Sequence, residues 1–118
     1  MAVVEALAAD GTPGVWACDP MHGNTFTAAS GRKTRRFEVV VDEVAGFFQV
    51  CRRQGVWPGG LHCELTGDDV TECLGGGEDV SEAQLDVNYT SACDPRLNAR
   101  QSLDLAFRVA ELLRSSPF

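Results

Sequence analysis

Hydrophobic residues recur at helical spacing in two long stretches of the chain. The first stretch covers residues 37–54, and Gly55 is well placed to end a helix there. Its apolar positions are Phe37, Val40, Val41, Val44, Phe47, Phe48 and Cys51. The second stretch covers residues 99–114 and is preceded by the capping pattern Asn98-x-x-Gln101. Its main stripe is Leu103, Ala106, Phe107, Ala110 and Leu113, widened by Leu105, Val109 and Leu112. We therefore predict two helices, the second buried on more than one side.

A short apolar run lies upstream of each of the two predicted helices and is separated from it by a polar stretch. Residues 14–18 end at Asp19-Pro20 and residues 60–65 end before Gly67, which is typical of short buried strands. Residues 2–9 have the composition of a short helix. Two polar stretches, 22–36 and 68–97, are expected to be long loops, the second with a helical turn at Ser81-x-x-Gln84. The glycines at 75–77 lack the pattern of a phosphate loop and are interpreted as a flexible connector.

The alternation of strands and helices predicts parallel strands joined by right-handed crossovers. Two parallel strands do not make a finished sheet, because both would be unpaired edges. The predicted fold class is therefore α/β, and the chain is expected to be a piece of a larger domain.

Composition narrows the functional classes. The chain has 118 residues with 44% hydrophobic and 23% charged residues, as expected for one small globular domain. A net charge of −7 argues against a nucleic-acid partner. No apolar run approaches the roughly 20 residues that span a bilayer, and the N-terminus does not resemble a signal peptide. The five cysteines form no CxxC pair, so reduced thiols and a cytoplasmic location are expected.

Candidate metal ligands fall near the ends of both predicted strands. His22 follows the first strand, Glu64 lies at the end of the second, and Asp94 lies in the second loop. Nitrogen and oxygen donors of this kind suit Mn²⁺, Fe²⁺, Co²⁺ or Zn²⁺. A loop histidine is also commonly just solvated, and spacing alone leaves both interpretations open. His62 shares a strand face with Glu64 and is interpreted as a core residue or a support for the ligands, with a role as a ligand itself as the less favoured alternative.

A basic cluster, Arg32-Lys33-Thr34-Arg35-Arg36, stands out against the acidic background. It could be a solvated loop that leads into a helix. Because it follows the C-terminal end of a strand, it could also bind an anionic substrate, for which Arg and Lys are suited.

Several strings resemble class II 3-deoxy-D-arabino-heptulosonate 7-phosphate (DAHP) synthases, in family order. They are CDPMHGNT (18–25), GRKTRRF (31–37), PGGLHCELTG (58–67), VTECLGG (70–76) and ACDPRLN (92–98). The resemblance implies a (β/α)8 TIM barrel, of which residues 1–118 would be the C-terminal portion. The chain would supply the last two strand–helix units and be incomplete by itself. Because it begins in the helix before the seventh strand, a truncated product or one part of a split enzyme is expected.

The resemblance also implies an activity and a metal site. The family condenses phosphoenolpyruvate with erythrose 4-phosphate to DAHP and phosphate, the entry to the shikimate pathway. Its divalent metal, with Mn²⁺ or Co²⁺ favoured, is held by Cys, His, Glu and Asp. Matched motif by motif, the last three fall on His22, Glu64 and Asp94, and Lys33 is a substrate contact. The cysteine ligand and the groups that grip phosphoenolpyruvate lie upstream of this chain. No catalytic residue is therefore assigned, and the chain alone is expected to be inactive.

Three roles follow as hypotheses. The chain could complete a barrel with an N-terminal fragment or as a homo-oligomer, it could bind and modulate a full-length synthase without catalysis, or it could be a relic. In isolation it is expected to be marginally stable and to associate, because apolar helix faces would be exposed. The faces named by this expectation contain Phe37, Val41, Val44, Phe48, Phe107 and Ala110.

Overall fold

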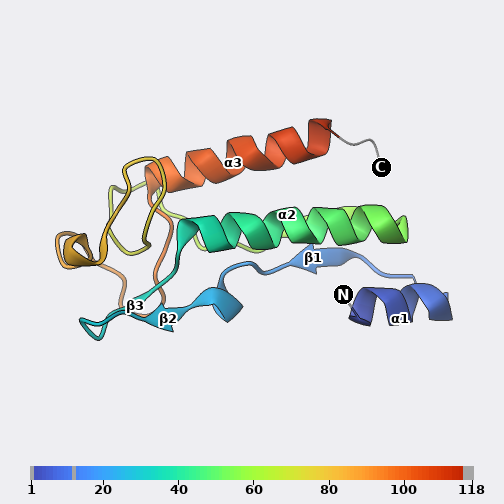
Figure 1. Ribbon diagram of the computed structural model, residues 1–118, viewed down its shortest axis with the longest axis horizontal. Helices are drawn as coiled ribbons and strands as arrows, with labels where there is room; N and C mark the ends of the chain where they lie inside the picture. Colours follow the sequence, from blue (N-terminus) through green and yellow to red (C-terminus); the bar gives the residue numbers. More distant parts are fainter. Residues whose placement is uncertain (1, 12, 116–118) are drawn as a thin grey trace.

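Two long helices, α2 (Phe37–Gln54) and α3 (Ala99–Arg114), run beside each other along the molecule (Figure 1). The computed structural model describes residues 2–11 and 13–115, leaving aside the side chains of residues 2, 4 and 8. Both helices have the predicted bounds. Gly55 ends α2 in the left-handed conformation, with φ 65°, and Asn98 caps α3 by accepting a hydrogen bond from the Gln101 amide at 2.8 Å.

Strands β1 (Trp16–Cys18) and β4 (Pro58–Leu61) pair in parallel, as predicted. Both differ from the predicted ranges of 14–18 and 60–65. Gly59 admits the earlier start of β4, because a Cβ there would lie 2.6 Å from the Trp16 carbonyl oxygen. The pairing ends where the His62 amide donates to the Cys18 carbonyl, and the only bridge of residues 63–65 is the isolated one between Leu65 and Leu97. The second strand is therefore shorter than its apolar run.

The predicted first loop contains short regular segments, namely η1 (His22–Asn24) and a hairpin of β2 (Phe26–Thr27) with β3 (Lys33–Thr34). The second contains the predicted turn as η2 (Glu82–Gln84). The prediction of a flexible connector at 75–77 is wrong. Gly75 and Gly76 have positive φ values, and a Cβ on Gly76 would lie 2.8 Å from Gln101 Cγ. This glycine segment is a tight turn packed against the start of α3.

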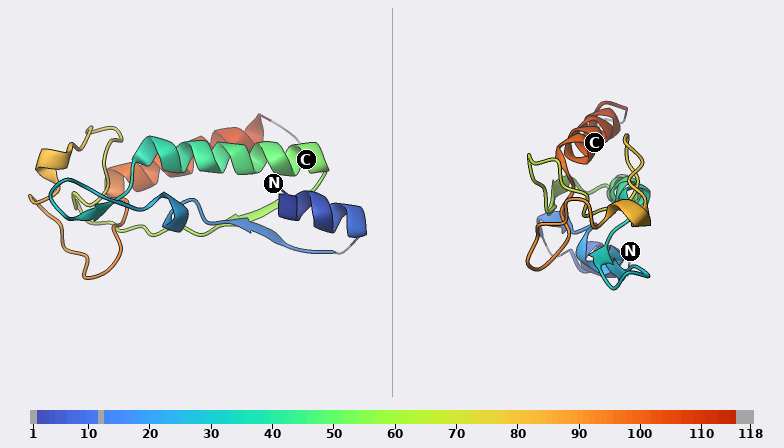
Figure 2. Two further views of the ribbon diagram at one scale, coloured as in Figure 1. Left: turned by 60° about the horizontal axis from the view of Figure 1, so that its bottom comes forward. Right: turned by 90° about the vertical axis from the view of Figure 1, so that its left-hand side faces the viewer.

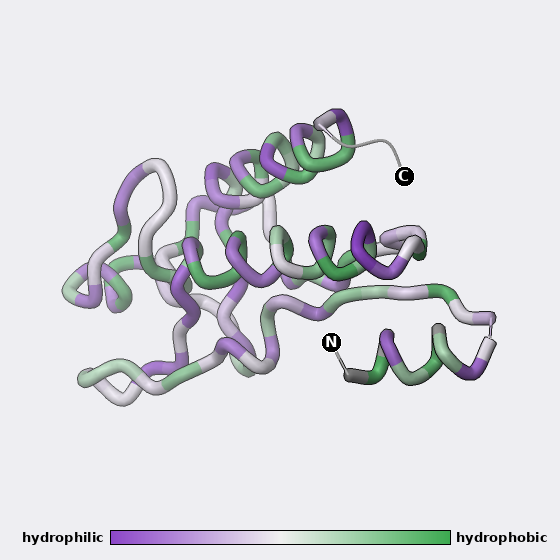
Figure 3. The backbone as a smooth tube through the Cα atoms, turned by 45° about the vertical axis from the view of Figure 1, so that its right-hand side comes forward, coloured by the Kyte–Doolittle hydropathy of each residue, from purple (hydrophilic) through white to green (hydrophobic). Residues whose placement is uncertain are grey.

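The hydrophobic core lies mainly between α2, α3 and the loop segments at one end. In Figure 3 hydrophobic and hydrophilic residues alternate along the turns of both helices. The principal buried cluster is Met21, Phe37, Val40, Val41, Val44, Phe48, Cys73, Leu97 and Leu105. The expectation that Phe37, Val41, Val44 and Phe48 would be exposed in isolation is therefore wrong, because these residues pack on the chain's own elements.

Helix α3 is buried on one side only, contrary to the prediction. Leu105 is buried, and Val109 and Leu112 pack against the core. Leu103, Phe107 and Leu113 are 57%, 68% and 45% exposed. This apolar stripe, which also contains Ala106 and Ala110, is called the outer face of α3 below.

The molecule is elongated, with principal extents of 49 × 27 × 18 Å. Figure 2 shows the loop segments gathered at one end, while helix α1 (Ala2–Asp10), one residue longer than predicted, lies at the other and contacts α2. Strand β1 runs toward the loop end, and β4 is parallel to it. Side chains that follow these strands therefore meet the loops there. Within the described residues, no helix is both long enough and apolar enough to cross a membrane.

Candidate metal centre

Three segments bring His22, Glu64 and Asp94 to the loop end of the sheet. His22 begins η1, Glu64 lies three residues beyond β4, and Asp94 lies in the segment before α3. One donor atom from each residue lies within 4.8 Å of the donors of the other two. His22 Nε2 is 3.3 Å from Glu64 Oε1 and 3.9 Å from Asp94 Oδ2. The structure thus brings together the three ligands predicted from the sequence.

Asp19 holds the His22 ring in place. Its Oδ2 lies 2.6 Å from His22 Nδ1, and its Oδ1 accepts hydrogen bonds from the backbone amides of Met21 and His22. Slight burial would raise the pKa of Asp19, but these hydrogen bonds with His22 and Met21 lower it to about 2. A carboxylate at Nδ1 favours a proton on that nitrogen, which would leave Nε2, the nitrogen that faces Glu64 and Asp94, available to bind a cation.

His62 stacks on His22, with ring centroids 5.9 Å apart and planes 26° apart. It is exposed, so its interpretation as a core residue is wrong, and it lies beside the candidate ligand His22. Asp19, His22 and His62 form a second group with metal-binding spacing. All three are exposed, and Asp19 already binds the His22 ring. The group of His22, Glu64 and Asp94 is therefore the better cation site.

Arg35 lies behind the ligands and is fully buried. Its Nη1 donates to Glu64 Oε2 and, at 2.6 Å, to the Pro95 carbonyl, while its Nε donates to Thr25 Oγ1 at 2.8 Å. The sequence could not separate this residue from its exposed neighbours in the basic cluster. Arg35 comes directly after β3, whose last residue, the buried Thr34, donates a hydrogen bond from its hydroxyl to the Glu72 carbonyl.

Glu72 organises the segment that carries Asp94. Its buried carboxylate accepts hydrogen bonds from Thr90, from the Ser91 amide, and from the backbone and side chain of Arg96. Burial alone would raise the pKa of Glu72, but the bonds from Arg96, Thr90 and Ser91 lower it to about 2. Residues 90–96 are therefore fixed around an ionised carboxylate, and Asp94 with them.

Lys33 lies at the rim of the site. Its Nζ is 3.7 Å from Asp94 Oδ1, its side chain is 59% exposed, and its carbonyl accepts a hydrogen bond from the Tyr89 hydroxyl. Besides the buried Arg35, the exposed Lys33 is thus a member of the basic cluster that lies next to a candidate ligand. Arg32 instead pairs with Asp86 at 2.7 Å, and its guanidinium lies over the Tyr89 ring.

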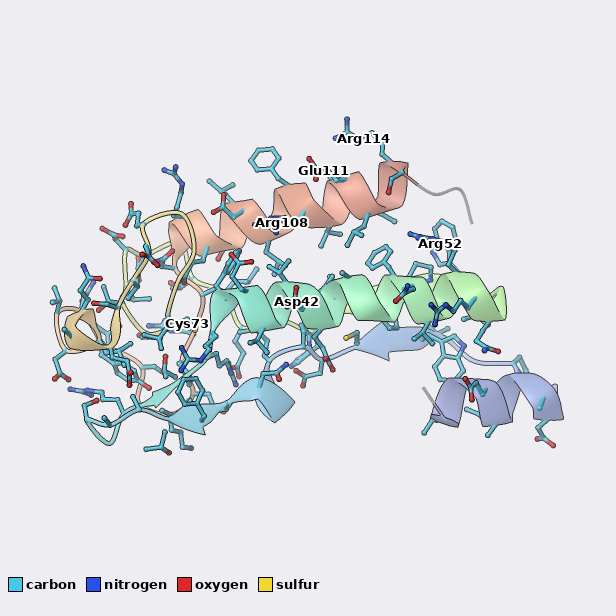
Figure 4. All side chains as sticks on the ribbon, viewed as in Figure 1. Asp42, Arg52, Cys73, Arg108, Glu111 and Arg114 are labelled. Carbon is cyan, nitrogen blue, oxygen red and sulfur yellow. The ribbon has the colours of Figure 1, made fainter. Side chains whose placement is uncertain are left out.

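The five cysteines are free thiols. Burial, with smaller contributions from nearby acidic groups, raises the pKa of Cys18 to about 11. Cys73, marked in Figure 4 near the loop end of α2, is fully buried, and its burial raises its pKa to about 12. These two thiols stay protonated at neutral pH and are poor metal ligands. The oxygen and nitrogen donors carry the site.

The motifs agree with comparisons to known proteins. Residues 1–110 match the Class-II DAHP synthetase family. The chain belongs to this family. It is 60% identical over 112 residues to a phospho-2-dehydro-3-deoxyheptonate aldolase of Streptomyces coelicolor, covering 95% of this chain and 25% of the relative. The enzyme of that name from Mycolicibacterium smegmatis is 55% identical over 112 residues, covering 95% and 24%.

This chain covers a larger share of a third relative. A phospho-2-dehydro-3-deoxyheptonate aldolase from Streptomyces lividans is 62% identical over 99 residues, covering 84% of this chain and 68% of the relative. The chain therefore spans about a quarter of the length of the first two relatives and about two thirds of the third.

Sequence reasoning missed the residues that position the ligands. Asp19, Arg35, Glu72 and Arg96 were present in the motifs but had no role assigned. Only Asp19 carried a usable signal, because an Asp three residues before a His can reach its Nδ1 across a turn. The partners of Arg35 and Glu72 lie 29 and 24 residues away in the chain, and local patterns do not encode such contacts.

Proposed function

We propose that this chain is the C-terminal part of a metal-dependent DAHP synthase. The complete enzyme condenses phosphoenolpyruvate with erythrose 4-phosphate, giving DAHP and inorganic phosphate, the first step of the shikimate pathway. The observation that carries the proposal is the convergence of His22, Glu64 and Asp94 from three segments onto one cation-sized space. Family membership supplies the reaction class.

The donor set fits a divalent ion. First-row metals bind nitrogen and oxygen ligands at about 2.0–2.2 Å, so donors that share one ion lie roughly 3–4 Å apart. The distances of 3.3 and 3.9 Å from His22 Nε2 to the two carboxylates agree with this spacing. One imidazole and two carboxylates suit Mn²⁺ or Co²⁺. When bound, the metal would act as a Lewis acid on the aldehyde carbonyl of erythrose 4-phosphate.

The chain's own residues then have separable tasks. His22, Glu64 and Asp94 would hold the metal, and Asp19 keeps the imidazole oriented. Lys33 would contact an anionic group of a substrate, because its ammonium lies at the rim beside Asp94 and is largely free to move. Arginine and lysine residues that bind phosphoenolpyruvate, and a cysteine ligand, would come from the rest of a TIM barrel.

The outer face of α3 and the two edges of the β1–β4 sheet give this chain surfaces for that remainder. Leu103, Phe107 and Leu113 are exposed along one stripe. In the part of the chain that the structure describes, β1 pairs only with β4, so each strand has one unpaired edge. Exposed edges and apolar stripes of this kind bind other polypeptide chains. We propose that the N-terminal barrel portion covers them in the cytoplasm, and that a homo-oligomer forms in its absence.

Co-expression tests the proposal directly. The chain would be produced with the N-terminal three quarters of a family member, and the complex assayed for DAHP formation with Mn²⁺ or Co²⁺. We expect activity that is lost in His22→Ala, Glu64→Gln and Asp94→Asn. Asp69→Asn, an exposed acid in the same half of the chain, is the matched control and should retain activity.

Two outcomes separate the alternatives. A stable complex without activity, in which the chain alters the rate of a full-length synthase, would favour a non-catalytic modulating role. Activity that persists in the Glu64→Gln and Asp94→Asn variants would exclude these residues as essential ligands.

A further inference from the structure

One guanidinium touches all three segments that carry the candidate ligands. Arg35 binds the Glu64 carboxylate itself, the carbonyl of Pro95 directly after Asp94, and the hydroxyl of Thr25 in the turn that begins at His22. Thr25 Oγ1 also donates to the Met21 carbonyl at 3.2 Å, which links this contact to the residue before His22. Within the described chain, these are the side-chain bonds of Arg35.

Arg35 is itself held firmly enough to act as a reference point. Its side chain is 0% exposed, and its backbone carbonyl accepts a hydrogen bond from the Leu74 amide at 2.8 Å. Its neighbours are also fixed, because Thr34 binds the Glu72 carbonyl and Arg36 forms a parallel bridge with Leu74. The planar guanidinium of a buried, anchored arginine loses little conformational entropy when it binds several acceptors.

We propose that Arg35 is a positioning residue that sets the spacing of His22, Glu64 and Asp94, an inference that rests on the metal site proposed above. Arg35 engages Oε2 of Glu64, which leaves Oε1 on the side of His22 Nε2. By binding Pro95 it fixes the backbone next to Asp94. The three ligands come from different loops, and the same cation ties all three loops together.

The competing explanation is charge compensation alone. Glu64 and Asp94 are two carboxylates close together, and any buried cation would reduce their repulsion. Lysine would provide that charge on a single nitrogen, which cannot occupy both the Nη1 position that binds Glu64 and Pro95 and the Nε position that binds Thr25. Arg35→Lys therefore separates positioning from charge.

The test measures Mn²⁺ binding to the 118-residue chain by paramagnetic broadening of its imidazole NMR signals. The chain has only two histidines, and both lie at the site, so these signals report it even when binding is weak. Replacing groups that support metal ligands typically weakens metal binding by about 10- to 100-fold. We expect that loss in Arg35→Lys, with an unchanged circular dichroism spectrum. Arg53→Lys, at the exposed end of α2, is the control and should bind as the original chain does.

A second pair covers the case in which Arg35→Lys does not fold. Thr25→Val removes the acceptor of Arg35 Nε, whereas Thr25→Ser keeps it. We expect weaker Mn²⁺ binding in Thr25→Val and binding close to that of the original chain in Thr25→Ser.

Two results would overturn the inference. One is a folded Arg35→Lys variant that binds Mn²⁺ within twofold of the original chain, and the other is equal binding by the two Thr25 variants. Failure of the metal site itself looks different. In that case the original chain shows no Mn²⁺ broadening, or broadening that survives Glu64→Gln and Asp94→Asn, and the role of Arg35 is rejected together with the site.

Discussion

Glu72→Gln is expected to destabilise the chain strongly, because the carboxylate is fully buried at the centre of six hydrogen bonds. Four of these end on Oε2 and two on Oε1. A glutamine can keep its carbonyl at the Oε2 position, but its amide group would then face the Arg96 amide and Nε at the Oε1 position. The Arg96 amide and Nε, both donors, would then face the amide nitrogen of the glutamine, which is also a donor. The Arg96 guanidinium would also lose the negative charge of its partner.

The lowered pKa of Glu72 indicates how much its carboxylate contributes to the free energy of unfolding. A pKa held at about 2 instead of 4.5 corresponds to about 3 kcal/mol of stability. Because the folded-state pKa is lowered, this stability is fully present above pH 4.5 and is lost as the pH falls from 4.5 through 2. The same range, roughly 2–4 kcal/mol, is expected for breaking a buried, hydrogen-bonded ion pair.

Urea unfolding followed by circular dichroism at pH 7 and pH 3 measures this difference. Glu78→Gln, an exposed glutamate of the same segment, is the control and should change stability by less than about 0.5 kcal/mol. The difference between the original chain and Glu72→Gln should shrink at pH 3, where the original chain has lost much of its own contribution. A difference below about 1 kcal/mol at pH 7, or one that is independent of pH, would refute this account of Glu72.

Three further predictions concern the ligand orientation, the sheet and the exposed helix face. Asp19→Asn should weaken Mn²⁺ binding by about 10-fold or more, measured by titration, because a neutral amide no longer fixes the proton on Nδ1 of His22. Gly59→Ala should lower the free energy of unfolding by about 1–3 kcal/mol, since its Cβ would clash with the Trp16 backbone, whereas Gly60→Ala has open space and should be nearly neutral. Phe107→Glu should reduce self-association in sedimentation velocity at micromolar concentration, while a folded original chain that is already monomeric would contradict the proposed interface.

The bounds of the two long helices could be predicted because their signals are local. Apolar spacing defines the buried side of α2, Gly55 ends it, and the Asn98–Gln101 capping box begins α3. The strands were less accurate for a physical reason. An apolar run shows where a strand can form, but the pairing partner decides how far it extends. Strand β4 begins at Pro58, two residues before its apolar run, and Gly59 admits the close approach of β1.

The apolar side of α2 was located correctly, but its exposure in isolation was wrongly expected, and the outer side of α3 was wrongly predicted to be buried. Both results depend on what the chain contains. Helix α2 finds its partners within these residues. The stripe of Leu103 and Phe107 has the same periodicity, yet it finds none among the described elements. Periodicity reports that a face is suited to burial, and it does not say which segment buries it. The exposed stripe is therefore consistent with a chain that spans a quarter of its longer relatives.

The candidate ligands His22, Glu64 and Asp94 could be named from motifs because they lie in distinctive strings, but the contacts that surround them could not. Those contacts include two ion pairs that join segments distant in sequence, Arg35 with Glu64 and Arg96 with Glu72. In each pair one side chain is fully buried and the other is partly exposed. Both pairs are formed entirely within this chain, so the three ligands can be preorganised before any other part of a barrel is added. If so, the remainder needs to contribute only further ligands and substrate-binding groups. Mn²⁺ affinity should then rise when that portion is added, whereas the spacing among the three ligands should stay the same.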